Sequence, residues 1–149
     1  MKIALAADHA GYEEKEKIKK TLDEIGVEYT DMGTNSCDSV DYPDYARMVG
    51  EAVARGDVDQ GLLVCGSGTG MAISANKVKG VRAAVAWNEE IARLARQHNN
   101  ANVLALAGRF VAADEQAKIV KAFFTTDFEG GRHAPRVDKI SQIESDDLC

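Results

Sequence analysis

A cysteine followed by a glycine-rich loop is the part of this sequence best suited to chemistry. The apolar run 62–64 leads into Cys65, and the next residues are Gly66, Ser67, Gly68, Thr69 and Gly70. Such a run predicts a buried parallel strand, and the glycines predict a tight turn into a helix. Glycines let the backbone approach a ligand closely, and the N–H groups at a helix start favour anions. A thiol there is expected to have a lowered pKa, because a helix start carries partial positive charge. The loop therefore offers a base or nucleophile beside several hydrogen-bond donors.

Met71 separates this loop from three well-known glycine-rich or cysteine loops. A P-loop needs a lysine after its last glycine, and a cysteine phosphatase needs an arginine six residues after its nucleophile; both positions fall on Met71. The dinucleotide-binding pattern G-x-G-x-x-G also fails, since its third glycine would fall on Met71 or Ile73. A glycine turn with a buried, inert cysteine is the structural alternative, because a free cysteine often behaves as a small hydrophobic residue.

The composition is that of an ordinary globular domain. The chain has 149 residues, 45% hydrophobic and 28% charged, and a single domain spanning residues 1–149 is expected. The net charge of −6 argues against nucleic acid as a partner, since phosphate backbones attract clustered Lys and Arg. The other cysteines, Cys37 and Cys149, form no C-x-x-C pair with Cys65 and are interpreted as non-functional, so neither a disulfide framework nor a metal site is expected. Without an apolar run of membrane-spanning length or a signal segment, a cytoplasmic protein with no membrane partner is predicted.

Strand and helix patterns alternate along the chain. Strands are expected at about 2–7, 27–31, 61–65, 81–87 and 103–107. Helices are expected at about 11–25, 42–56, from the glycine loop to 76, and at 88–97, 112–123 and 137–146. This alternation predicts the α/β class: a single doubly wound, flavodoxin-like five-stranded parallel sheet of order 2-1-3-4-5, with a C-terminal helix.

Two polar clusters are expected to meet at one edge of this sheet. In doubly wound folds ligands bind beyond the carboxyl ends of the strands, where the winding reverses, here between the first and third strands. Asp8 and His9 end the first strand, and Cys65 ends the third. This shared edge favours a functional thiol over an inert one.

His98 and Asn99 precede the fifth strand and so belong at the opposite edge. A strand of about five residues at about 3.3 Å each separates the two edges by roughly 16 Å. One chain therefore cannot readily bring His98 to Cys65, whereas a neighbouring subunit could. The alternative is a surface histidine at a helix C-terminus, where the helix dipole favours it.

Three arginines are candidates for binding an anion. Arg132 and Arg136 lie four residues apart near the start of the last helix, and Arg109 follows the fifth strand. A guanidinium is suited to forked recognition of phosphate. A solvated basic patch is the alternative, and Arg109 is the weakest of the three candidates.

Six segments together closely resemble ribose-5-phosphate isomerase type B, a family grouped with the galactose-6-phosphate isomerase subunits. The resemblance covers residues 1–144 and is carried by 7–11, 41–43, 65–70, 75–77, 96–99 and 130–133. It implies an aldose–ketose isomerase without metal or cofactor. It also implies a phosphorylated sugar as substrate and a homodimer or dimer of dimers with active sites shared between subunits.

The resemblance implies a role for each candidate residue. Cys65 would be the base that moves a proton between C1 and C2 through an enediolate, and His98 would assist opening of the furanose ring. The enediolate oxygen would be stabilised by Asn99 and by the loop residues Gly66, Ser67, Gly68, Thr69 and Gly70. Asp8 would contact sugar hydroxyls, and the phosphate or the far end of the substrate would be held by His9, Arg109, Arg132 and Arg136. Two departures stand out: Ser67 replaces a common threonine, and Met71 replaces the glutamate of one branch, which leaves Cys65 as the base.

Three functions follow from these observations. The expected one is reversible isomerisation of ribose 5-phosphate and ribulose 5-phosphate in the pentose phosphate pathway, since a carbon acid beside a carbonyl needs a base and donors for the developing oxyanion. The second is the same reaction on allose or galactose 6-phosphate. The third is a non-catalytic nucleotide- or flavin-binding module, against which the failed dinucleotide pattern argues.

Overall fold

The computed structural model describes residues 1–146, so Cys149 lies outside the described part. The strands are β1 (Lys2–Ala7), β2 (Glu28–Asp31), β3 (Gln60–Cys65), β4 (Ala83–Val85) and β5 (Val103–Ala107). The helices are α1 (Tyr12–Glu24), α2 (Tyr42–Ala54), α3 (Thr69–Ala75), α4 (Glu89–Asn99), α5 (Ala113–Phe124) and α6 (Ala134–Ser145), with a short 3-10 helix η1 (Gly131–His133) before α6. The predicted alternation is confirmed, although β4 is shorter than expected and α6 begins earlier.

All strands pair in parallel, in the order β2-β1-β3-β5-β4, so the predicted order is wrong in its last two positions. The burial of the two strands explains the exchange. β5 is buried along its whole length and fits between two neighbours, whereas the short, half-buried β4 suits an edge. The side chain of Asn76 covers part of this edge, accepting the N–H of Ala83 at 2.7 Å and donating to its carbonyl at 2.9 Å.

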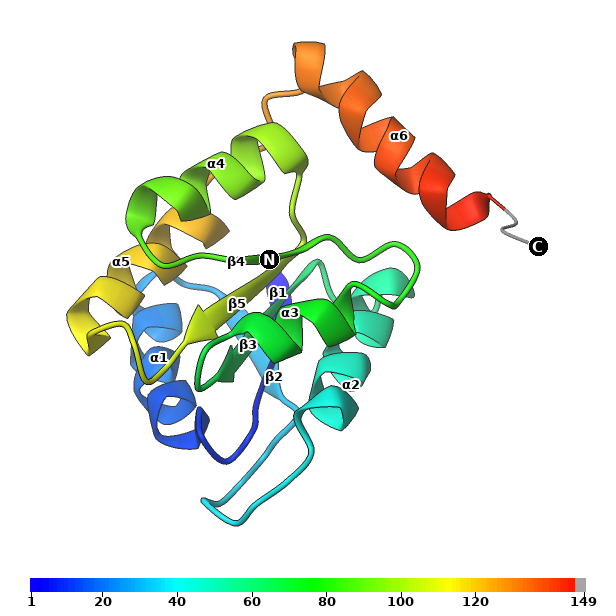
Figure 1. Ribbon diagram of the computed structural model, residues 1–149. Helices are drawn as coiled ribbons and strands as arrows, with labels where there is room; N and C mark the ends of the chain where they lie inside the picture. Colours follow the sequence, from blue (N-terminus) through cyan, green and yellow to red (C-terminus); the bar gives the residue numbers. More distant parts are fainter. Residues whose placement is uncertain (147–149) are drawn as a thin grey trace.

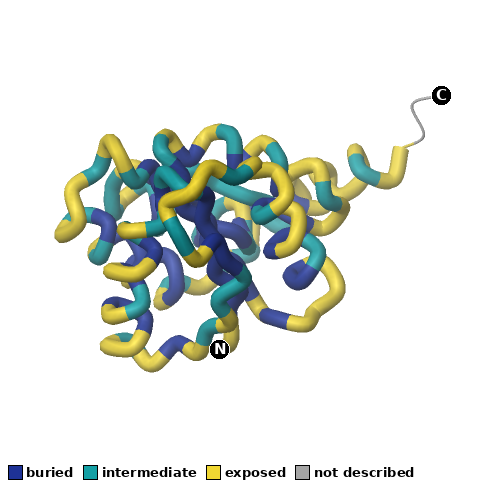
Figure 2. Tube along the Cα trace, turned by 90° about the horizontal axis from the view of Figure 1, so that it is seen from below, coloured by how far each residue is buried: buried dark blue, intermediate teal, exposed yellow. Residues whose placement is uncertain are grey.

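Helices cover both faces of the sheet and enclose two apolar clusters (Figure 1). α1, α4 and α5 pack together on one face, and α2 and α3 on the other. The central strands form the buried spine of the molecule (Figure 2). Among residues 1–146, no helix combines the length and apolar character needed to cross a bilayer.

Local sequence signals explain where several helices begin and end. Pro43 occupies the first turn of α2, where its missing N–H costs nothing. The Asn88 side chain accepts the N–H of Ile91 at 2.8 Å and caps α4, which ends at Asn100 in a left-handed conformation. α6 extends away from the body of the molecule (Figure 1), and its Ile143 is exposed.

Candidate active site

A cavity of about 380 Å³ lies at the carboxyl ends of β1, β3 and β5. It brings together side chains that the sequence places far apart. The lining residues are Asp8, His9, Ala10, Tyr42, Cys65, Gly66, Ser67, Gly70, Arg109 and Phe110. Seven of them are among the predicted site residues: Asp8, His9, Cys65, Gly66, Ser67, Gly70 and Arg109.

The sulfur of Cys65 sits at the base of the glycine loop. The residue is 5% exposed, and its Sγ accepts the backbone N–H of Gly68 at 3.1 Å. Gly68 has a φ of 79°, and a Cβ there would come within 3.1 Å of the Leu106 carbonyl carbon. Only glycine therefore fits this turn without strain. Thr69 starts α3 with its side chain exposed, outside the cavity lining.

Burial raises the pKa of the Cys65 thiol, so the predicted lowering is wrong for the free protein. Hydrogen bonds from the amides of Met71, Gly68 and Ser67 lower the pKa, but they do not offset burial, and the nearby Asp8 carboxylate raises it further. α3 has only seven residues, and Cys65 as a whole is buried. The loss of hydration thus raises the pKa of Cys65 more than the loop amides at the helix start lower it. These amides still donate to the sulfur.

Asp8 and His9 are held by backbone donors at the end of β1. The buried Asp8 accepts the N–H of Gly11 at 3.0 Å through Oδ1. His9 accepts the N–H of Val40 at 3.2 Å through Nδ1, so a neutral ring carries its proton on Nε2. That tautomer leaves Nε2–H as a donor. Gly11 allows the close packing, since a Cβ there would lie 2.2 Å from the Val64 carbonyl oxygen.

Arg109 reaches the cavity because β5 lies beside β3. The N–H of Gly108 donates to the Cys65 carbonyl at 2.8 Å, and the N–H of Arg109 donates to the Gly66 carbonyl at 3.1 Å. A Cβ at Gly66 would come within 3.3 Å of Arg109 Cδ, so the arginine stem lies against the loop. With the predicted strand order this contact would not form. The arginine that the sequence ranks lowest is the one in this cavity.

Two aromatic residues of the cavity, Tyr42 and Phe110, are not among the predicted site residues. Tyr42 packs its ring against Gly70, where a Cβ would lie 2.7 Å from Cε2. Phe110 is 78% exposed at the rim. For Tyr42, the sequence contains one indication of this contact, which is Gly70 itself. A glycine inside a loop indicates that another group approaches the backbone closely. Nothing in the sequence distinguishes Phe110 from a core residue.

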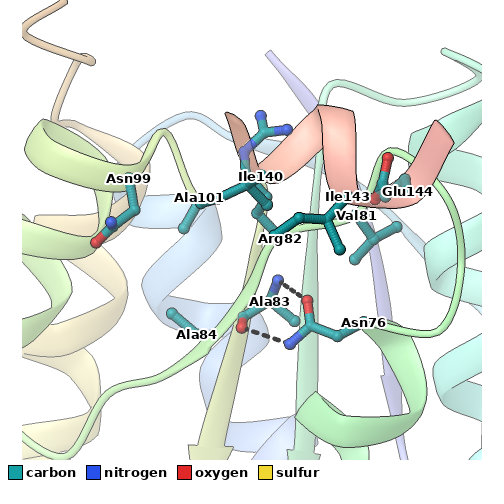
Figure 3. A pocket seen from close by; sticks show the side chains of 10 residues that line it. All are labelled: Asn76, Val81, Arg82, Ala83, Ala84, Asn99, Ala101, Ile140, Ile143 and Glu144. Carbon is teal, nitrogen blue, oxygen red and sulfur yellow. Dashed lines mark hydrogen bonds between the residues drawn. The ribbon is translucent and has the colours of Figure 1, made fainter. Parts of the chain in front are cut away.

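Apart from the loop residues Gly68 and Thr69, four predicted residues do not line this cavity: His98, Asn99, Arg132 and Arg136. The ring of His98 stacks on His133, with centroids 4.2 Å apart and planes 16° apart. Arg132 and Arg136 are exposed. Asn99 lines a different, mostly apolar cavity of about 430 Å³ between the β4 edge and α6 (Figure 3).

Comparison with known proteins decides the family. The model of the Ribose/Galactose Isomerase family matches residues 3–140. This chain belongs to that family. It is 48% identical to ribose-5-phosphate isomerase B of Escherichia coli over 143 residues, which cover 96% of each chain. The resemblance seen in the sequence is therefore confirmed.

Solved structures of isomerases from this family share the whole fold. The chain superposes on ribose-5-phosphate isomerase B of Clostridium thermocellum with a TM-score of 0.95 at 48% identity, covering 97% of this chain and 98% of that one. It superposes on the Mycoplasma genitalium enzyme, solved with bound ribulose-5-phosphate, with a TM-score of 0.93 at 46% identity, covering 98% and 97%.

Proposed function

We propose that this isomerase-family member interconverts ribose 5-phosphate and ribulose 5-phosphate. The observation that carries the proposal is the cavity in which the Cys65 sulfur meets the loop amides beside Asp8, His9 and Arg109. Relatives that are 46–48% identical are ribose-5-phosphate isomerases, and one of them was solved with ribulose-5-phosphate bound. An aldose–ketose isomerase needs a base, donors for an oxyanion and groups that hold a phosphate, and this cavity has all three.

Cys65 is the base in this proposal. Its thiolate removes the proton from C2 of open-chain ribose 5-phosphate, the C1–C2 double bond forms, and O1 becomes the enediolate oxygen. The proton on O2 then passes to O1, the C2 carbonyl forms, and the Cys65 thiol returns its proton to C1. Donors preorganised for the developing oxyanion are worth about 3–4 kcal/mol each in comparable sites, and the amides of loop 66–70 supply them.

The groups around the sulfur orient the sugar phosphate. Asp8 contacts the sugar hydroxyls, while His9 donates through Nε2–H and Arg109 through its guanidinium to the phosphate end. A phosphate is a fitting ligand for these donors, since charge-assisted hydrogen bonds to it are short and strong. With a net charge of −6, the protein depends on such local donors rather than on its overall field to capture an anion.

The proposed active site is completed by a second copy of the chain, in a homodimer or dimer of dimers. His98, Asn99, Arg132 and Arg136 lie outside the cavity around Cys65 in their own chain. In the assembly, His98 of one copy opens the furanose ring held against Cys65 of the other, and Asn99 joins the enediolate donors. The two arginines join the phosphate site.

A solvent-labelling assay tests the reaction and the base together. Wild-type protein given ribose 5-phosphate in D₂O is expected to place solvent deuterium at C1 of the ketose, because a proton on the sulfur exchanges with solvent. Cys65→Ala is expected to lose isomerisation while it still binds ribose 5-phosphate in calorimetry. Absence of wild-type isomerisation refutes the function; near wild-type turnover by Cys65→Ala refutes the role of the thiol.

Mixing two inactive variants tests the shared site. Cys65→Ala carries an intact His98, and His98→Asn carries an intact Cys65. If sites are shared, a mixed dimer contains one complete site, and an equal mixture recovers about a quarter of the wild-type rate on ribose 5-phosphate after subunit exchange. A mixture no more active than its two components refutes the shared site.

A hexose 6-phosphate is the second candidate substrate, because the family that matches the chain includes galactose isomerases. The ratio of kcat/KM for ribose 5-phosphate to kcat/KM for allose 6-phosphate and galactose 6-phosphate decides between them. A ratio in favour of the pentose supports the main proposal.

A further inference from the structure

His98, Glu129 and His133 form a cluster of potential metal ligands away from the cavity around Cys65. Their ligand atoms all lie within 4.8 Å of one another. His98 comes from the last turn of α4, His133 from η1, and Glu129 from the segment that joins α5 to η1. The N–H of Glu129 donates to the carbonyl of Gln97 at 3.1 Å, which ties that segment to α4. The cluster is therefore fixed by backbone contacts and not only by side-chain rotamers.

One nitrogen of the cluster has no partner within residues 1–146. The His133 side chain is 8% exposed, and its Nε2 makes no hydrogen bond there. The nearest acid, Glu129, has Oε2 at 3.6 Å, which is longer than a hydrogen bond. A buried polar atom without a partner is uncommon and points to a group that could satisfy it. A group bound between Nε2 and the Glu129 carboxylate would contact both.

The donor set identifies the chemical class of the ligand. Two imidazoles and a carboxylate suit zinc and related divalent transition metals. With bonds of about 2.0–2.1 Å, donors around a tetrahedral ion lie about 3.4 Å apart. The pair of His133 and Glu129, at 3.6 Å, already has this spacing. His98 completes the set by turning out of its stack on His133, since stacked rings do not aim their lone pairs at one point. His98 is only half-buried, which leaves room for that turn.

The charged groups around the cluster affect which ion it can hold. Burial, followed by the neighbouring His98 and Arg132, lowers the pKa of His133, whereas Glu129 raises it. Arg132 and Arg136 repel a cation, and the carboxylate of Glu129 partly neutralises them. A site with this balance favours an ion with strong nitrogen affinity over calcium or magnesium.

We propose that His98, Glu129 and His133 bind a zinc-class divalent metal ion, which reversibly inhibits the isomerase by taking His98 away from ring opening. The ion is an inhibitor and not a cofactor of the proton transfer at Cys65. The proposed metal binding depends only on the geometry of the cluster. The inhibition rests on the proposed function of His98, and the experiments below separate the two.

Metal binding is tested with Co²⁺ followed by its visible absorption, and with Zn²⁺ by calorimetry. One ion per chain is expected, and the cobalt spectrum should lack the intense near-ultraviolet band of a thiolate ligand. Glu129→Gln and His133→Gln should each weaken binding by about tenfold or more, because each removes one arm of a chelate. The matched control is His9→Gln, which removes a histidine from the other cavity and should leave binding unchanged. Glu129 is exposed, so its variant tests the site without disturbing the core.

Inhibition is tested in both directions of the reaction. A ketopentose phosphorylated at C5 cannot close a furanose ring, so ribulose 5-phosphate reaches the enzyme open and ribose 5-phosphate does not. Zn²⁺ should slow conversion of ribose 5-phosphate more than conversion of ribulose 5-phosphate, a chelator should restore the rate, and Glu129→Gln should be less sensitive.

Each contrary outcome overturns a specific part of the proposal. Binding that survives both Glu129→Gln and His133→Gln, or a thiolate band in the cobalt spectrum, refutes the metal site. Binding that needs both residues but slows both directions equally supports the site and refutes the ring-opening role of His98.

Discussion

Lys15 provides a sharp test of how the fold supports the cavity. Its side chain is fully buried, and its ammonium donates to Asp31 Oδ1 at 2.7 Å and to the Thr34 carbonyl at 2.6 Å. The N–H of Thr34 in turn donates to the carbonyl of Ala7 at 2.8 Å. Ala7 is the last residue of β1, directly before the first residues of the cavity. Lys15 therefore anchors the backbone that fixes the position of those residues.

Lys15→Met removes this anchor while keeping most of the side-chain volume. Removing one partner of a buried ion pair costs about 3–5 kcal/mol, because the other partner stays buried. Asp31 is partly exposed and keeps Lys19 at 2.7 Å, so we expect the lower end, about 3 kcal/mol. In a chain of this size each kcal/mol lowers Tm by about 2–4 °C, which gives a decrease of about 6–12 °C.

Lys19→Met is the matched control, because Lys19 pairs with the same carboxylate from a partly exposed position. Exposed pairs contribute about 1 kcal/mol or less, so its Tm should fall by about 4 °C at most. Both variants are measured by thermal unfolding followed by circular dichroism, and by urea unfolding at one temperature. If the two variants unfold within about one degree of each other, the reasoning about the buried anchor is wrong.

The same variant also links the fold to the proposed function. Well below its Tm, Lys15→Met should raise KM for ribose 5-phosphate more than it lowers kcat, since the shifted backbone carries His9 and its phosphate contact. Lys19→Met should leave both constants near the wild-type values. A proportional loss of active protein in Lys15→Met, with an unchanged KM, would show that the anchor supports stability alone.

Three further predictions follow from the same structure. Burial raises the pKa of the Asp31 carboxyl, but hydrogen bonds from Lys15 and Lys19 outweigh burial, so the pKa is lowered overall. The ionised carboxyl therefore stabilises the folded protein above its unfolded pKa. In acid unfolding experiments this stability should be lost as pH falls through the folded pKa. Burial raises the pKa of Cys65, so kcat/KM should increase with pH through neutrality, and a profile flat from neutral to alkaline pH would contradict a thiolate base. Gly11→Ala should destabilise the protein by about 3 kcal/mol or more in urea unfolding, because its Cβ would lie 2.2 Å from the Val64 carbonyl oxygen, which belongs to a central strand and cannot move.

The fold class could be predicted because strands and helices alternate with clear periodicity. The apolar runs of β1, β3 and β5 are uninterrupted, as expected for strands buried on both faces. The order of the last two strands could not be predicted in the same way. Residues 103–107 are apolar, residues 81–87 are apolar apart from Arg82, and the sequence contains no measure of how many neighbours each strand has. Their order depends on which of the two strands pairs with β3, and tertiary packing decides this.

The same limit explains which site residues could be placed. Asp8, His9 and Cys65 were predicted to meet because strand ends in a parallel sheet share an edge, whatever the order of the outer strands. Arg109 depends on the position of β5, so its contact with Gly66 became visible only in the structure. The direction of the pKa change at Cys65 depends on the burial of the sulfur, which composition and spacing do not reveal.

A single chain is not sufficient for the proposed reaction, because His98 lies outside the cavity around Cys65 in its own chain. α4 leads back toward the start of β5, and Cys65 pairs in register with Ala107 at the far end of that strand. A rigid five-residue strand therefore lies between the two proposed catalytic groups, and no rotamer change closes such a gap. Either the histidine serves the cavity of another copy or it takes no part in catalysis. Recovery of activity on mixing the two inactive variants separates these alternatives, because it requires a thiol and an imidazole from different chains.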